Sequence, residues 1–288
     1  KCKQSKQELE EFKREMNKAK HYIKSILVCG CDDCDQLGKR TYIKVNDYYS
    51  IYPPMNLSID PSTILSFSVY MDHSVIVMND GSLKGCGENC EGQINPDLQR
   101  SRIDKFTDFC IKDSYNQKLD AVSAVCYSYG TLYMVSKSGN HNNERQLVLC
   151  DCSINNGNQV FLDIGKHQPV SLFGGNDLMA AIGSEGEVIL IDHYSIEKSP
   201  NSPIEAVYLP DDEKASSIAC LNVSVVVLSL NGRVFISPVE SNGALNFSIV
   251  SELAGYEIIY LSGKFDHCLA VSKEGRVFAR GSNEYGEI

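Results

Sequence analysis

Two aspartate–histidine pairs are the residues of this chain whose types and spacing best suit chemistry. Asp72-His73 and Asp266-His267 each stand directly before a run of apolar residues. A carboxylate beside an imidazole can orient the ring, hold its proton or offer a polar contact to a partner. Because both pairs begin a predicted β-strand, we expect them to project toward the same end of the folded chain.

The rest of the chain lacks the familiar catalytic motifs. It contains no Gly-x-Ser-x-Gly elbow, no His-Glu-x-x-His helix and no Gly-x-x-x-x-Gly-Lys-Ser/Thr phosphate loop. The six histidines show no metal-ligand spacing. Acidic pairs such as Asp32-Asp33 and Asp211-Asp212 fall in predicted loops, where aspartate commonly forms turns. The sequence therefore predicts no catalytic residue, no cofactor and no enzyme.

Twelve cysteines raise the question of zinc or redox chemistry. Three groups lie close together: Cys29-x-Cys31-x-x-Cys34, Cys86-x-x-x-Cys90 and Cys150-x-Cys152. Structural zinc is held by two Cys-x-x-Cys or Cys/His knuckles together, and Cys31-x-x-Cys34 has no second knuckle to pair with it. When similar segments of the chain are aligned, arginine, serine, glutamate and tyrosine share positions with several of these cysteines. We therefore expect reduced thiols and no metal, and we keep a zinc or redox protein as a third alternative.

The chain repeats a strand–turn–strand unit. Residues 72–94 and 266–288 align without a gap, and each has a glycine in its turn. This turn glycine occurs five times, at intervals of 58, 47, 46 and 43 residues: Gly81, Gly139, Gly186, Gly232 and Gly275. An apolar run precedes each of them, and a further short apolar strand lies about ten residues upstream of each hairpin. Glycine suits such turns because it adopts positive φ at little steric cost.

A second motif, Gly-x-Asn-x-x-Gly, follows two of the hairpins. It begins at Gly87 and Gly281, and a variant with aspartate in place of asparagine begins at Gly30. We expect these three glycines to form structural turns as well. A unit of roughly 40–50 residues with several short strands cannot bury both faces alone, so its copies must stack, and a ring of such sheets is a β-propeller. The WD40 type does not fit because the chain has no tryptophan, and the Gly-Gly doublet of kelch repeats occurs only at Gly174-Gly175.

The Gly-x-Asn-x-x-Gly-Gln-Leu ending after a hairpin resembles the RCC1 repeat, the regulator of chromosome condensation type. The match is close over Gly87–Ile94 and Gly281–Ile288 and fair over Gly30–Gly38. This resemblance implies an all-β propeller of about seven blades, of which the chain supplies five to six. We therefore expect residues 26–288 to form an RCC1-like propeller that is part of a longer protein and is incomplete at its C-terminus.

Residues 1–25 differ from the rest in composition. They are rich in Lys, Glu and Gln and contain no glycine or proline. Their apolar residues recur at helical spacing: Leu9, Phe12, Met16, Ala19 and Ile23. We expect an amphipathic α-helix here that packs on the flank of the propeller or links it to an upstream domain.

The resemblance also nominates a binding site. In the exchange factor that names the RCC1 family, residues that act on a Ran-type GTPase lie at this kind of position on one propeller face. Carried over to this chain, the comparison nominates Asp72, His73, Asp266 and His267 as partner-binding residues. The other expectation is structural, because histidine at this position braces the loop backbone of a neighbouring blade in RCC1-like repeats. The remaining three repeats lack the pair, which argues against a preserved exchange face.

Taken together, these features predict a protein–protein interaction scaffold or adaptor. The resemblance implies that the propeller is the recognition part of a larger protein, for example one with a BTB or ubiquitin-ligase module. It also implies a protein partner, such as a small GTPase or a component of the ubiquitin pathway. The alternative is a guanine-nucleotide exchange factor for a Ran-type or other small GTPase.

Composition limits the partners further. The formal net charge is −10 at pH 7, with 43% hydrophobic and 22% charged residues. Such a chain lacks the clustered Lys and Arg that bind a phosphate backbone, so we expect no direct nucleic-acid partner. No run of 18 consecutive apolar residues and no signal peptide are present. We therefore expect no membrane association and a cytoplasmic location, with the nucleus as the alternative.

Overall fold

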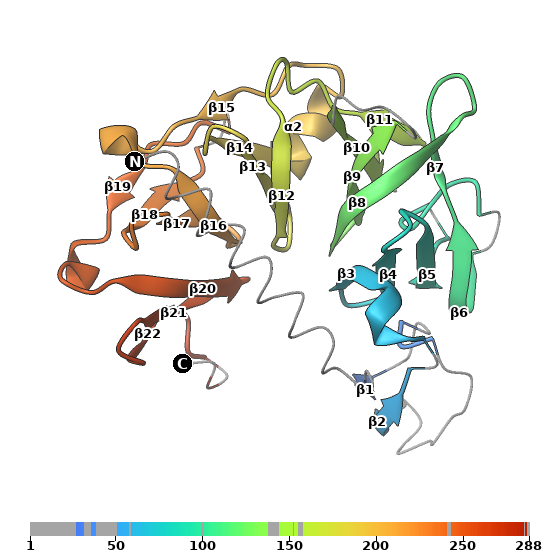
Figure 1. Cartoon of the computed structure of the whole chain (residues 1–288), viewed down its shortest axis with the longest axis horizontal. Coiled ribbons are helices and arrows are strands. Elements are labelled where there is room, and N and C mark those ends of the chain that lie inside the picture. The colour runs from blue at the N-terminus through green and yellow to red at the C-terminus, as the bar shows by residue number, and fades with distance from the viewer. Residues whose placement is uncertain are drawn as a thin grey trace.

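A computed structural model describes residues 27–31, 36–38, 51–57, 59–90, 92–98, 101–137, 144–151, 153–154, 158–240, 243–284 and 286. Their strands form antiparallel sheets that follow one another around an arc, in chain order (Figure 1). The predicted all-β propeller is confirmed. The predicted helix over residues 1–25 and the turn glycine Gly139 lie outside the described residues.

We number the six sheets of the described part as blades. Blade 1 contains β1 (Leu27–Cys31) and β2 (Ile51–Asn56). Blade 2 contains β3 (Ile64–Val69), β4 (His73–Met78), β5 (Leu83–Glu88) and β6 (Arg102–Phe109). Blade 3 contains β7 (Ile111–Lys112), β8 (Lys118–Tyr127), β9 (Gly130–Lys137), β10 (Arg145–Asp151) and β11 (Gln159–Phe161).

Blades 4 to 6 complete the arc. Blade 4 contains β12 (Pro169–Gly174), β13 (Leu178–Gly183), β14 (Val188–Asp192) and β15 (Ala206–Val207), with helix α2 (His193–Lys198) after β14. Blade 5 contains β16 (Ala215–Cys220), β17 (Ser224–Ser229), β18 (Val234–Pro238) and β19 (Ser248–Ile249). Blade 6 contains β20 (Ile258–Lys264), β21 (His267–Ser272) and β22 (Val277–Gly281). Short 3-10 turns lie at Pro61–Thr63, Pro210–Asp212 and Ser251–Leu253.

The three strands predicted for each repeat are present in blades 2 to 6. The sequence pattern did not predict the fourth strand that closes blades 2 to 5, the additional strand β7 of blade 3, or α2. β15 and β19 have two residues each, too few to show an alternating pattern. No helix in the described part of the chain is long and apolar enough to cross a membrane.

The core lies between the blades. A sheet with a neighbouring blade on each side is covered on both faces, so its middle strands are apolar throughout and do not alternate. All six residues of β13 are buried, and five of the six in β17 are buried. Between blades 5 and 6 a cavity of about 330 Å³ remains, lined by residues such as Val234, Ile236 and Phe278.

A backbone hydrogen bond joins consecutive blades on the face of the ring that carries the glycine hairpins. The first long strand of every blade from 2 to 6 carries an irregularity of register near its start. At three junctions the N–H at this irregularity donates to the carbonyl of the preceding blade's hairpin glycine. These bonds run from Ala121 to Gly81 (3.0 Å), from Ala215 to Gly186 (2.9 Å) and from Ile258 to Gly232 (3.0 Å).

The hairpin glycines meet two requirements at once. Gly81, Gly186 and Gly232 have φ of +77°, +86° and +76°, a region that L-residues with a side chain rarely adopt. The next blade also comes close to them. A Cβ on Gly186 would lie 2.5 Å from the Cβ of Lys214, whereas a Cβ on Gly275, in blade 6, would meet nothing within 4 Å.

This difference provides a matched pair of substitutions. Gly186 and Gly275 have nearly the same φ, +86° and +81°, so alanine costs about 1 kcal/mol of backbone strain at both positions. Only Gly186→Ala should add the cost of displacing the next blade, about 1–3 kcal/mol. Urea unfolding of the two variants measures the difference in the free energy of unfolding. Equal destabilisation would show that the close approach of blade 5 has no energetic weight.

Candidate functional site

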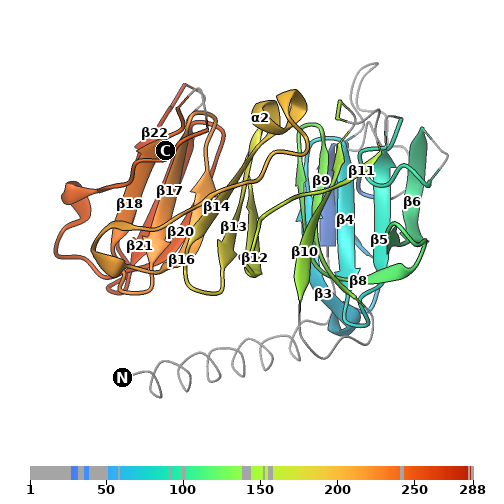
Figure 2. The ribbon, with the colours of Figure 1, turned by 90° about the horizontal axis from the view of Figure 1, so that it is seen from above.

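The turns between the first two long strands of blades 2 to 6 lie at one end of the ring, which we call the turn face. These strands enter each blade in the same direction, so the turns after them gather at the same end (Figure 2). The turn face consists of residues 70–72, 128–129, 175–177, 221–223 and 265–266. Both aspartate–histidine pairs belong here, each at the start of a second strand.

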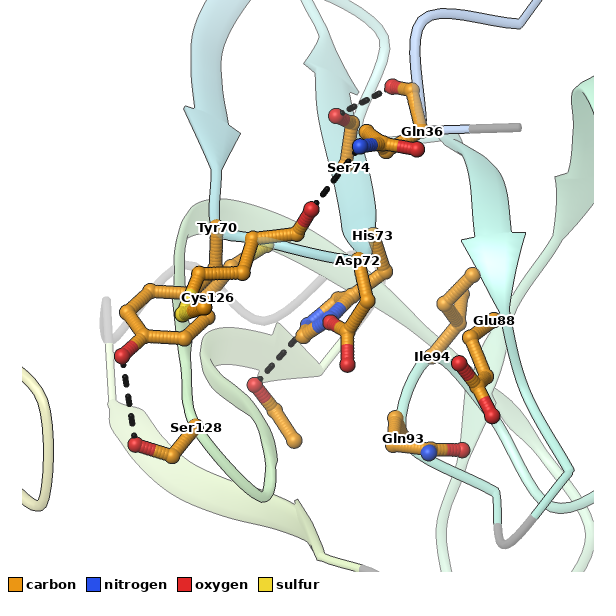
Figure 3. A network of polar contacts seen from close by, with 12 residues as sticks. Gln36, Tyr70, Asp72, His73, Ser74, Glu88, Gln93, Ile94, Cys126 and Ser128 are labelled. Atoms are coloured by element: carbon orange, nitrogen blue, oxygen red, sulfur yellow. Dashed lines mark hydrogen bonds and ion pairs between the residues drawn. The ribbon is translucent and has the colours of Figure 1, made fainter. Parts of the chain in front are cut away.

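His73 is fully buried and connects blade 2 to blade 3 (Figure 3). Its Nδ1 lies 2.7 Å from Oδ1 of Asp72. Its Nε2 lies 3.0 Å from the carbonyl oxygen of Gly130 and 3.1 Å from Oγ1 of Thr131, at the start of β9. The ring is therefore a brace between blades and has no surface with which to touch a partner, which removes His73 from the nominated binding residues.

The surroundings of His73 favour its protonated form. A carboxylate and a carbonyl both accept hydrogen bonds, so a ring that donates from both nitrogens satisfies both neighbours. Burial alone lowers the pKa of His73, but the sulfur of Cys126 and the hydrogen bond with Asp72 outweigh it and raise this pKa to about 10. Asp72 keeps 28% of its side chain exposed, so it can hold His73 and still face solvent.

Two of the predicted turn glycines serve a different purpose. Gly87 and Gly281 lie at the ends of strands β5 and β22, paired with His73 and His267. Their φ values are +107° and +126°, and a Cβ would lie 2.2 Å and 1.9 Å from the carbonyl oxygens of Asp72 and Asp266. Close approach to the aspartate backbone, rather than a turn, requires glycine here.

A third predicted turn glycine is also placed in a strand. Gly30 lies within β1 and pairs with Tyr52 of β2. Its motif continues into Gln36, which packs against blade 2: the side chain of Gln36 donates to the carbonyl of Met71 at 2.9 Å. The Gln36 carbonyl accepts from the hydroxyl of Ser74 at 2.6 Å (Figure 3). The motif after the hairpin therefore fastens one blade to the next.

The second pair, in blade 6, is more open than the first. Asp266 is exposed and accepts a hydrogen bond from Nδ2 of Asn222 at 3.0 Å. His267 is half-buried in β21, and within the described residues it makes no hydrogen bond to another blade. The structure thus places Asp72, Asp266 and His267 on one face of the ring, but it does not bring the two pairs together into one site.

Side chains from four blades meet near the centre of the turn face. The hydroxyl of Tyr70 makes hydrogen bonds with Ser128 and Asn176, from blades 3 and 4. The ammonium of Lys264, from blade 6, lies 4.0 Å from the centre of the Tyr70 ring. Burial lowers the pKa of Lys264 and raises that of Tyr70, and the charges of Asp177 and Asp72 raise the pKa of Tyr70 further.

Apolar side chains are exposed around this polar centre. Met71 is 69% exposed, Val223 is 70% exposed and Phe265 is 40% exposed. These three residues occupy turns of blades 2, 5 and 6. Sequence reasoning missed them because a single apolar residue in a turn carries no pattern. The alignment of the repeats offered a signal. Met71 and Phe265 directly precede the two aspartate–histidine pairs, and Val223 stands at the aspartate position of its own repeat.

Seven cysteines of the described part of the chain are free thiols. Five of the seven are buried: Cys86, Cys126, Cys150, Cys220 and Cys268. Burial raises the pKa of Cys220 to about 12, which opposes formation of the reactive thiolate. Within the described ranges, no group of three or more His, Cys, Asp or Glu residues could hold a metal ion.

Comparisons with known proteins identify the fold. No protein-family model matches the sequence, and no curated protein does. Human WBSCR16 shares 13% identity with a TM-score of 0.66, over 89% of this chain and 73% of WBSCR16. Saccharomyces cerevisiae Prp20p shares 14% identity with a TM-score of 0.65, over 91% of this chain and 67% of Prp20p. In the complex of Kap60 with Prp20, the yeast RCC1, the match has 13% identity and a TM-score of 0.50.

The chain therefore has the fold of an RCC1-like β-propeller, in divergent form. At 13–14% identity, the likeness defines the architecture and leaves the activity to be argued from the residues themselves. The crystal structure of Prp20p was described together with its binding to Gsp1p and histones. That property belongs to Prp20p.

The brace at His73 makes stability depend on pH in a definite direction. Its pKa in the folded chain, about 10, lies above the unfolded value of about 6.5. The stabilisation is therefore fully present below pH 6.5 and is lost as the pH rises toward 10. We expect His73→Gln to lower the free energy of unfolding by about 2–3 kcal/mol near pH 6, and by less at pH 9.

His267→Gln is the matched control, because His267 occupies the same repeat position without the contact to a following blade. Urea unfolding between pH 6 and pH 9.5 would measure both variants against the unmodified chain. A difference for His73→Gln that stays constant or grows with pH would contradict a protonated brace. An equally large effect for His267→Gln would show that the repeat position, rather than the contact between blades, determines stability.

Proposed function

We propose that this propeller is a protein-interaction scaffold whose partner binds the turn face. The observation that carries the proposal is the combination of exposed apolar and acidic side chains on that face. Met71, Val223 and Phe265 offer apolar contact area, while Asp177 and Asp266 have no ion-pair partner within the described residues. Exposed apolar residues beside charged ones are the common composition of protein-binding surfaces.

The rigidity of the ring supports the same function. The turns are short, and several are fixed by hydrogen bonds to the next blade, such as Asn222 N–H to the carbonyl of Phe265 at 2.7 Å. Ser128 N–H likewise donates to the carbonyl of Asn176 at 3.1 Å. A surface held in this way loses little conformational entropy when a partner binds. Rigid rings with exposed turns are suited to recognition, because the scaffold positions residues contributed by several repeats.

As an adaptor, the propeller would act as the recognition part of a larger assembly. We propose that a BTB or ubiquitin-ligase module accompanies the propeller. The partner would belong to the ubiquitin pathway or be a small GTPase. The acidic balance of the chain, −10 at pH 7, supports a basic protein surface as the partner. Reading the coding sequence on both sides of this segment would test the adaptor role directly.

Guanine-nucleotide exchange is the second candidate function. It is favoured by the fold shared with Prp20p, whose binding to Gsp1p has been described, and by the position of Asp72 and Asp266 on the turn face. It is disfavoured by the burial of His73, which withdraws one nominated residue from contact. Exchange would require the turn face to distort the nucleotide site of a bound GTPase, so both candidates use the same surface.

The scaffold proposal predicts that one face of the ring controls partner binding. Replacing Met71 and Val223 by serine and Phe265 by asparagine should remove the apolar contacts and leave the fold intact. Asparagine suits position 265 because Phe265 has φ of +55°, which asparagine tolerates better than most residues. Quantitative affinity capture should show partners retained by the unmodified chain and lost by this triple variant.

The control carries equivalent changes at the opposite end of the ring. Tyr115 and Leu230 are 80% and 67% exposed and lie in turns away from the turn face, so Tyr115→Ser with Leu230→Ser should retain the partners. Thermal unfolding confirms that both variants remain folded. The proposal is wrong if the two variants capture the same proteins, or if the control variant alone loses them.

The exchange alternative predicts a different result. Release of a fluorescent guanine nucleotide from Ran-, Rab- and Rho-type GTPases should remain at the basal rate when the propeller is a scaffold. Strong acceleration for any of these GTPases would replace the scaffold proposal with exchange. In that case Asp72→Asn and Asp266→Asn should slow the accelerated release, while Leu230→Ser should leave it unchanged.

A further inference from the structure

An aromatic cluster lies on the turn face beside α2. Tyr129, in the turn of blade 3, stacks on His193 with ring centres 3.9 Å apart and an interplanar angle of 6°. Tyr194 meets the same ring edge-on, with centres 5.1 Å apart and an angle of 75°. α2 begins at His193 after the third strand of blade 4, which points toward the turn face (Figure 2). Residues of two blades thus form one cluster.

The histidine in this cluster is held in place by a buried carboxylate. His193 is buried, and its Nδ1 lies 2.9 Å from Oδ2 of Asp151. Asp151 is fully buried and also accepts a hydrogen bond from Tyr127. Burial raises the pKa of Asp151, but hydrogen bonds from His193, Tyr127 and Ser153 outweigh it, and the net pKa is lowered. A buried carboxylate that stays ionised holds His193, and through it the stacked Tyr129, in one orientation.

The two tyrosines remain accessible. Tyr194 is 47% exposed and Tyr129 is half-buried. The hydroxyl of Tyr194 donates to Oδ2 of Asp177 at 3.4 Å. A hydrogen bond between Tyr129 and Tyr194 is the largest cause that raises the pKa of Tyr129 to about 12, and burial adds to it. The phenol of Tyr129 therefore stays neutral near pH 7. The rings of both tyrosines have electron-rich faces that attract cations.

A carboxylate without a cation lies next to these rings. Asp177, in the turn of blade 4, is half-buried. Oδ1 of Asp177 accepts from the hydroxyl of Ser128 at 3.0 Å, and Oδ2 accepts from Tyr194. No Lys, Arg or His within the described ranges pairs with it. Each carboxylate oxygen accepts more than one hydrogen bond, so Asp177 can still bind a planar cation.

We propose that Tyr129, Tyr194 and Asp177 form a binding site for an arginine side chain of the protein partner. A guanidinium is flat, so it can lie against a tyrosine ring and direct N–H groups toward a carboxylate at the same time. Two electron-rich rings and an unpaired carboxylate complement this group in charge. Lysine fits less well because its ammonium is compact and strongly hydrated.

This inference rests on the proposed function and specifies the chemistry of the partner. The partner would present an exposed arginine to the part of the turn face beside α2. Apolar residues of the partner would contact Met71, Val223 and Phe265, in the turns of blades 2, 5 and 6. Arginine and tyrosine both occur often at the residues that dominate binding energy in protein interfaces. The cluster is therefore expected to act as an anchor rather than as the whole interface.

The experiment is an NMR titration of the chain with tyrosine-selective isotope labels. The probes are N-acetyl-arginine methylamide, its lysine analogue and its citrulline analogue, which has nearly the shape of arginine without the charge. Tyr129→Phe and Tyr194→Phe assign the two signals among the fifteen tyrosines. The arginine probe should shift the Tyr129 and Tyr194 signals saturably. The lysine probe should bind more weakly, and the citrulline probe should not bind.

Variants then separate the parts of the site. Tyr194→Ala should weaken arginine binding about fivefold, which corresponds to roughly 1 kcal/mol of cation–π attraction. Asp177→Asn should weaken binding by a similar factor or more. Glu205→Gln is the matched control, because it removes one charge from an exposed position just before β15 and should leave binding unchanged.

Several results would overturn the proposal. Equal shifts with the arginine and citrulline probes would show that charge has no part in binding. Equal weakening by Asp177→Asn and Glu205→Gln would indicate attraction to the overall charge instead of to a site. Shifts confined to other tyrosines would place binding elsewhere. None of these results affects the capture experiment with the Met71, Val223 and Phe265 variant, so failure of the arginine site and failure of the scaffold are distinguishable.

Discussion

One hydrogen bond between backbone groups of consecutive blades determines much of this architecture. A strand that enters a new blade carries an irregularity of register, and such an irregularity takes an N–H group out of the ladder within its own sheet. The carbonyl of the preceding hairpin glycine accepts that N–H, as between Ala215 and Gly186. Positive φ at the glycine directs the carbonyl outward, and the missing side chain lets the next blade approach. Neither the glycine nor the irregularity can change alone.

The two faces of the ring therefore differ in the groups that hold neighbouring blades together. At the hairpin end the same backbone bond recurs at three junctions at 2.9–3.0 Å, so the blades on either side of them are tied to this pattern. At the turn face the junctions are held in more than one way: the side chain of His73 reaches the start of β9, whereas the backbone N–H groups of Ser128 and Asn222 donate to the carbonyls of Asn176 and Phe265. Variable side chains at the turns leave room for recognition, because the backbone bond at the other end already fixes the spacing between blades.

What could be predicted from the sequence follows the same division. The strands around Gly81, Gly186, Gly232 and Gly275 were predictable, because apolar runs and turn glycines report on local geometry. The site was less predictable, because its contacts join residues far apart in the chain. Asp151 and His193 are 42 positions apart, and nothing near either residue indicates the other. The repeat singled out Asp72 and His73, but burial of the histidine depends on Gly130 in a different blade.

The contact between Lys264 and Tyr70 joins two distant blades of the ring. These residues come from blades 6 and 2, which are not consecutive, and the ammonium lies 4.0 Å from the centre of the ring. Burial, which lowers the pKa of Lys264, removes water that would otherwise weaken the attraction between cation and ring. Blades 2 and 6 are thereby tied across the centre of the arc on the turn face. Because Phe265 and Asp266 directly follow Lys264, and Met71 and Asp72 directly follow Tyr70, this one contact fixes apolar and acidic residues of two distant blades relative to each other. A partner that binds there meets a surface already assembled, so more of its contact energy contributes to affinity.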